Sequence, residues 1–129
     1  MNTPLLIAGS LSFLAFLAHV FVGDKEIRYL KPGEEEPVHA TTFWIQARGG
    51  WHWVSVDLLL ASLFLLSVAI TAASNEWSKF LHLLSVYFFV CGASWLTTVL
   101  FSRNNNKQLL TVGQWIFCFI MSGLIYAGS

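Results

Sequence analysis

Four long stretches without a charged side chain constrain this chain more than any other feature. They cover residues 1–23, 58–75, 80–102 and 108–129 and hold 23, 18, 23 and 22 residues. Because a helix rises about 1.5 Å per residue, roughly 20 apolar residues cross the hydrocarbon core of a bilayer. A helix also satisfies its own backbone hydrogen bonds in lipid. The stretches therefore predict an all-α protein, a four-transmembrane-helix antiparallel bundle.

Composition and length leave little room for anything else. Of the 129 residues, 56% are hydrophobic and 11% are charged, which is too apolar for a soluble domain of this size. We expect a single integral membrane domain over 1–129, with helices at about 4–23, 52–73, 79–102 and 108–128 and a loop at 24–50. The net charge is zero and no basic patch stands out, so nucleic acid is not an expected partner. The expected partner is the lipid bilayer itself.

The distribution of Lys and Arg predicts the orientation. Six of the seven basic residues fall in two connecting segments that would share one side of the membrane, and only Lys79 falls on the other. Basic residues favour the cytoplasmic side, so both termini are predicted outside and the segment 24–50 inside. No Lys or Arg precedes the first stretch, which we interpret as a retained helix and not a removed leader. The expected location is a membrane that the chain crosses several times.

Local signals set the expected helix ends. Pro4 suits a first helical turn, with Asn2 or Thr3 as the cap. The first helix is expected to continue toward Ile27, because nothing before Pro32 breaks it except Gly23. Gly49-Gly50 is interpreted as a hinge between an interfacial segment and the second membrane helix. Residues 74–79 and 103–107 are interpreted as tight turns. Cys91 and Cys118 lie inside apolar stretches and are expected to be small core residues, not a disulfide.

One face of the first helix is small and polar. Ala8, Ser12, Ala15, His19 and Glu26 recur at spacings of four, three, four and seven residues. Small residues mark helix contacts in lipid, so this stripe is expected to face the other helices while Phe13 and Phe16 face outward.

Two histidines carry the metal hypothesis. His19 ends the first membrane helix and His52 opens the second, so they share a depth. They could bind a transition metal or haem, with Glu26, Asp57 or Gln114 as a further ligand or a supporting hydrogen-bond partner. Without a metal, the same residues would form a hydrogen-bonded clamp. His82 begins the third helix at the opposite surface and is not part of this group.

Two further polar residues call for an explanation. Asp57 lies inside or just below the start of the second membrane helix, where a carboxylate needs a partner or water. It could serve transport of a small solute or proton, or simply reach the headgroups. Gln114, early in the fourth stretch, is expected to form an interhelical hydrogen bond.

A short pattern resembles a known group of proteins. It consists of His19-x-x-x-Gly23-x-x-Glu26, then Trp51-His52, then Gln114-Trp115. This pattern resembles small bacterial four-helix inner-membrane proteins of uncharacterised function. The resemblance implies four spans, and it implies that His19, Glu26, His52 and Gln114 gather on one side. It implies no activity, and the acidic run at Glu34 to Glu36 is not part of it.

These observations rank the function classes. No Gly-x-Ser-x-Gly, phosphate-binding loop or Cys-x-x-Cys pair is present, so no catalytic residue is predicted. The leading hypothesis is a non-catalytic accessory or interaction subunit of a membrane assembly, with another membrane protein or a second copy as partner. A metal- or haem-binding protein using His19 and His52 is the alternative. Transport through Asp57 is a further alternative.

Overall fold

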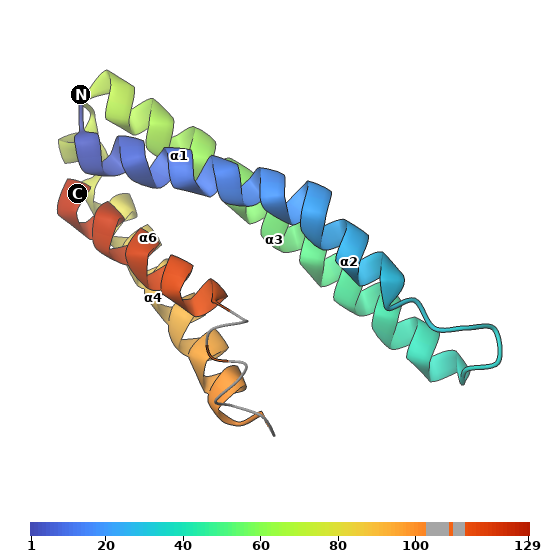
Figure 1. Cartoon of the computed structure of the whole chain (residues 1–129). Helices are drawn as coiled ribbons and strands as arrows, with labels where there is room; N and C mark the ends of the chain where they lie inside the picture. The colour runs from blue at the N-terminus through green and yellow to red at the C-terminus, as the bar shows by residue number, and fades with distance from the viewer. Residues whose placement is uncertain (103–108, 110–112) are drawn as a thin grey trace. The chain divides into compact units, whose positions relative to one another are not determined.

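The computed structural model describes residues 1–102, 109 and 113–129 as a set of helices and their connections. In chain order the helices are α1 (Thr3–Ala18), η1 (His19–Gly23), α2 (Asp24–Tyr29), α3 (Val38–Thr71), α4 (Ser74–Leu100) and α6 (Gln114–Gly128) (Figure 1). No strand occurs in these ranges. The predicted all-α class is therefore confirmed for the part of the chain that is described.

Among the described residues, three helical runs are long and apolar enough to cross a membrane. They are Thr3–Tyr29, which joins α1, η1 and α2, then α3 and then α4. Helix α6 is apolar but has 15 residues as described. The predicted start of the fourth span at residue 108 lies outside the described residues. The helices are compatible with a multi-pass membrane protein.

The chain forms two compact units. Unit 1 contains Met1–Ala8 and Leu65–Ser129, and unit 2 contains Gly9–Phe64. In unit 2, the run from α1 to α2 lies alongside α3 (Figure 1). The hydroxyl of Ser62 donates to the carbonyl of Gly9 at 2.9 Å, and that of Ser12 donates to Leu58 at 2.8 Å. Residue numbers rise on one helix as they fall on the other, so unit 2 is an antiparallel helical hairpin.

Unit 1 pairs α4 with α6, also antiparallel. The Ser85 hydroxyl donates to the carbonyl of Ser122 at 2.9 Å, and Gly92 lies against Cys118 and Phe119. The start of the chain is tied to the same unit, because the Asn2 side-chain amide donates to the carbonyl of Gly128 at 2.7 Å. Small residues and serines thus form the helix contacts, as expected for helices in lipid.

The predicted packing stripe on the first helix is confirmed for its N-terminal residues, Ala8 and Ser12. Ala8 and Ser12 are fully buried, and Ala15 and His19 are half-buried. Of the two residues expected to face outward, Phe13 is 40% exposed, whereas Phe16 is half-buried, like Ala15. The cap is Asn2, since its side-chain oxygen accepts the backbone N–H of Leu5 at 3.3 Å. Both cysteines are free, Cys91 half-buried and Cys118 buried.

The connection expected at 24–50 differs from the structure. Helix α2 continues the first run to Tyr29, as the sequence indicated, and α3 begins at Val38, well before 52. Only residues 30–37 remain as the connection, around the Pro32-Gly33 turn. The expected hinge at Gly49-Gly50 is also absent, because α3 runs through both glycines. Each glycine inside a helix costs about 1 kcal/mol relative to alanine. Contacts from α3 to α2 and η1, made on both sides of the pair, offset this cost.

The second turn is shorter than expected. Helix α3 ends at Thr71 and α4 begins at Ser74, so only Ala72 and Ala73 connect them. Ala72 adopts a left-handed φ of 54°, which allows the chain to reverse in two residues. Residues 74–79, predicted as a turn, are the first turns of α4, and Glu76 stands in its first turn, where the helix dipole favours an acid. The third predicted turn, at 103–107, lies outside the described residues.

Candidate functional site

The candidate site lies in unit 2, where α1 passes into α2 and faces the middle of α3. It begins at η1, a single π-helical turn between two α-helical segments. In this turn the backbone N–H of Asp24 donates to the carbonyl of His19, five residues back. Such π turns occur mostly as local insertions in α-helices, often at functional positions.

Trp51 on α3 accounts for this turn. Its indole N–H donates to the same carbonyl of His19 at 3.0 Å, so this oxygen accepts two hydrogen bonds. The indole ring also stacks on the imidazole of His19, with centroids 3.8 Å apart and planes within 5°. A single side chain therefore holds both the backbone and the ring of His19. We call this pair the His19–Trp51 stack.

Gly23 makes room for the stack. A Cβ atom placed on Gly23 would lie 2.1 Å from Cζ2 of Trp51, a separation that real atoms do not adopt. Glycine is thus required where the indole crosses the helix. This contact gives the pattern His19-x-x-x-Gly23 with Trp51 a physical meaning, since the three residues form one packing unit.

The second nitrogen contact of His19 is also defined. Its Nδ1 lies 2.9 Å from the hydroxyl of Ser55, one turn along α3 from Trp51. Ser55 is buried, and its hydroxyl is also 3.3 Å from the carbonyl of Trp51. The direction of the hydrogen bond between His19 and Ser55 depends on the tautomer of the imidazole.

A charged group lies directly beyond the stack. The carboxylate of Asp24 is buried, with a side chain 8% exposed, and it contacts three basic side chains. Arg28, one turn along α2, contacts Oδ2, while Nε of Arg48 is 3.1 Å and Nε2 of His52 is 3.4 Å from Oδ1. We call Asp24, Arg28, Arg48 and His52 the Asp24 cluster. It joins α2 to α3 through charge-assisted hydrogen bonds.

Trp44 extends the same joint by a further turn. Its indole N–H donates to the carbonyl of Ile27 at 2.9 Å, near the end of α2. The guanidinium of Arg48 lies over the Trp44 ring, 5.6 Å from the centroid. The indoles of Trp44 and Trp51 therefore each bind a backbone carbonyl of the opposite helical run, one on either side of the Asp24 cluster.

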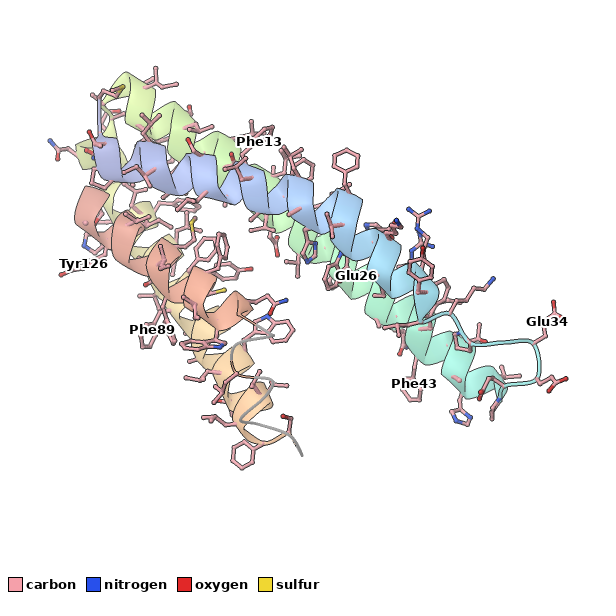
Figure 2. The ribbon with its side chains drawn as sticks, viewed as in Figure 1. Phe13, Glu26, Glu34, Phe43, Phe89 and Tyr126 are labelled. Atoms are coloured by element: carbon pink, nitrogen blue, oxygen red, sulfur yellow. The ribbon has the colours of Figure 1, made fainter. Side chains whose placement is uncertain are left out.

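The acid that contacts His52 is Asp24. Helical spacing had predicted that Glu26 would lie on the same face as His19. Glu26 is exposed, and Figure 2 labels it on α2. The physical reason is the π turn, which inserts one extra residue between His19 and the next turn. In a regular helix the residues four and seven positions after His19 would share its face. Because of the inserted residue, Asp24, five positions after His19, shares that face instead. A sequence signal did exist, since Asp24 and Arg28 form an i, i+4 pair.

The other predicted polar residues, Asp57 and Gln114, are both exposed. Asp57 is exposed on α3, between Ser55 and Leu58, which are both buried. Gln114 is the first residue of α6 in unit 1 and is exposed. His82, in α4, has its Nδ1 2.8 Å from the carbonyl of Ser78. In the described ranges, no group of three or more His, Cys, Asp or Glu side chains could hold a metal ion.

Comparisons with known proteins do not assign this chain to a family. No family model, no curated protein and no solved structure matches the chain.

Proposed function

We propose that the protein is a non-catalytic accessory or interaction subunit of a membrane assembly, and that unit 2 presents its α2–α3 end to a partner. The observation that carries the proposal is a rigidly joined hairpin end that nevertheless exposes large apolar side chains. Five of them, 58–84% exposed, follow the Asp24 cluster toward the connection, and together we call them the hairpin-end surface: Tyr29, Leu30, Val38, Phe43 and Ile45.

The length of α3 supports an aqueous location for this surface. Its 34 residues correspond to about 51 Å, whereas the hydrocarbon core needs about 30 Å. The uncharged part of α3 lies toward Thr71, so the excess is at the Val38 end. Charged residues precede that end in the sequence, namely Lys31 and the glutamates at 34–36. Figure 2 shows Glu34 at the far end of the hairpin.

The proposal includes the finer arrangement that the sequence predicts. The four apolar stretches form an antiparallel bundle in a bacterial inner membrane, with both termini outside and the hairpin end in the cytoplasm. The distribution of Lys and Arg supports this orientation. A cysteine placed at Glu35 should then be protected from an impermeant thiol reagent in intact cells. Strong labelling there would reverse the orientation.

Site-specific photocrosslinking tests the accessory role. A photoreactive residue at Phe43, which is 66% exposed on α3, should give one discrete protein adduct in native membranes (Figure 2). The same probe at Phe13, on α1 and inside the first apolar stretch, is the matched control and should give no such adduct. Leu30→Glu should abolish the Phe43 adduct while the protein remains folded. A complete lack of protein adducts from Phe43, Val38 and Leu30 would contradict the proposal.

A second candidate function is metal or haem binding. It is favoured by the position of His19 and His52 on the same hairpin end, where Nε2 of His52 lies 3.4 Å from the Asp24 carboxylate and the ring of His19 stacks on the neighbouring Trp51. Elemental analysis and an absorption spectrum of the purified protein would detect a bound metal or haem. Loss of the metal in His52→Ala, with helical content unchanged, would favour this function. A preparation without metal in which His52→Ala only lowers stability would reduce the group to a clamp.

A further inference from the structure

We propose that the Asp24 cluster binds a phosphate group at the membrane surface, and that the group belongs to the headgroup of an anionic phospholipid. The proposal rests on the membrane location of the chain and not on its accessory role. It concerns the exposed basic side chains of the Asp24 cluster, whereas the buried Asp24 carboxylate joins α2 to α3.

The charges of the cluster do not balance. Asp24 contributes one negative charge, Arg28 and Arg48 contribute two positive charges, and His52 adds a third when it is protonated. The carboxylate is buried while the basic side chains are not, since those of Arg28, Arg48 and His52 are 62%, 34% and 48% exposed. The excess positive charge is therefore presented outward, where an anion can approach.

Asp24 also fixes the direction of the two guanidinium groups. It binds Arg48 through Nε, so most of the five N–H donors of this planar group are directed elsewhere. The Trp44 ring under Arg48 holds the plane of the group. Arg28 is held through Nη2 by the carboxylate and through Nε by the backbone carbonyl of Asp24 at 3.4 Å. Two pre-oriented guanidinium groups match the bidentate geometry of phosphate oxygens.

The depth of the cluster matches the phosphate layer of a bilayer. Asp24 is the first charged residue after 23 uncharged ones. On α3, Arg48 lies five residues from the 78%-exposed Trp53, or about 7–8 Å along the axis, and exposed Trp side chains prefer the headgroup level. The polar layer on each side of the core is about 5–8 Å thick. A lipid phosphate would thus reach the arginines without leaving its plane.

The same chemistry would accept a soluble phosphate ester, so the experiment has two ligand arms. Native mass spectrometry of the full-length protein in detergent would follow binding of one phosphatidylglycerol molecule. Glycerol phosphate would be added as the soluble competitor. We expect one lipid to bind well above the background, and we expect glycerol phosphate to displace it only at a concentration at least about a hundredfold higher. Equal binding of the two ligands would overturn the lipid assignment.

Three variants test the cluster itself. Arg48→Gln should weaken binding about tenfold, since one charge-assisted pair of hydrogen bonds is worth at least about 1.4 kcal/mol. Arg48→Lys keeps the charge and should still lose about threefold, because the planar fork is gone. Lys31→Gln removes one charge from the exposed connection and should change binding less than twofold. Equal effects of Arg48→Gln and Lys31→Gln would show a diffuse charge effect and overturn the proposal.

Asp24→Asn separates positioning from net charge. This substitution makes the cluster more positive by one charge, so attraction by net charge alone predicts tighter lipid binding. If Asp24 instead holds the two arginines in position, its replacement should weaken lipid binding by about threefold or more. Circular dichroism of each variant would establish that the helices remain formed. Tighter binding by a folded Asp24→Asn protein would overturn the positioning role.

Discussion

The two helical hairpins solve the same packing problem with different side chains. In unit 1, α4 and α6 meet through Ser85, Ser122 and Gly92, which are small and let the backbones approach. Unit 2 uses Ser12 and Ser62 in the same way along its apolar stretch. Beyond His19 it changes to indoles, imidazoles and ion pairs. In lipid, small residues are sufficient to hold two helices together, because a hydroxyl there has few other hydrogen-bond partners. In water, two helices need contacts between larger side chains to stay together.

The change occurs between Ser12 and His19 on the first helical run. Before η1 the contacts are serine hydroxyls on carbonyls. The His19–Trp51 stack lies at the first residue of η1, and the Asp24 cluster follows its last residue. The position of the change coincides with the end of the first uncharged stretch at Gly23. This coincidence supports the assignment of the Asp24 cluster to the membrane surface.

The largest effect is expected for Gly23→Ala. The added methyl group would overlap the Trp51 ring, so either the stack or the π turn must move, at a cost of about 3 kcal/mol. The matched control is Gly49→Ala, because a Cβ there meets nothing within 4 Å. It should stabilise α3 by up to about 1 kcal/mol through helix propensity. Unfolding in detergent, followed by circular dichroism, measures both values. Equal effects of the two variants would remove the role assigned to Trp51.

A smaller loss is expected for Trp51→Phe. Phenylalanine keeps an aromatic ring for stacking on His19 but cannot donate to its carbonyl. The π turn would lose one of its two donors, at a cost of about 1–2 kcal/mol. Trp53→Phe is the control, since Trp53 is largely exposed, and its effect should stay within about 0.5 kcal/mol. The same unfolding measurement applies. If both tryptophans tolerate the change equally, the indole hydrogen bond does not stabilise the turn.

The smallest effect is expected for Gly92→Ala in unit 1. A Cβ there would lie 3.1 Å from the Phe119 ring and 3.2 Å from Cβ of Cys118, which is tight but not overlapping. The helices would separate by a few tenths of an ångström, and the net cost should be about 1 kcal/mol after the gain in helix propensity. Gly123→Ala meets nothing within 4 Å and should be neutral or stabilising. A cost as large as that of Gly23→Ala would abolish the distinction between the two hairpins.

The sequence by itself determined which parts of the chain are apolar helices. Uncharged stretches of about 20 residues predict helices because lipid leaves the backbone no other partner, and α1, the apolar part of α3 and α4 follow this rule. The pattern of His19, Gly23, Trp51 and His52 was also visible in the sequence, and the structure brings these residues to one place. A cap at Asn2 or Thr3, and Ala8 and Ser12 on the packing face, followed from local chemistry and helical spacing, and the structure selects Asn2 as the cap.

Only the tertiary structure decided how far the helices extend and which acid serves the site. The segment 38–51 has polar and glycine residues that indicate no membrane helix, yet Trp44, Arg48 and Trp51 fix it as helix through contacts with residues far away in the sequence. Because of the π turn, Asp24 and not Glu26 lies on the face of α2 that contacts α3. A regular helical period cannot reveal this, because the extra residue is stabilised by the indole of Trp51 on the opposite helix.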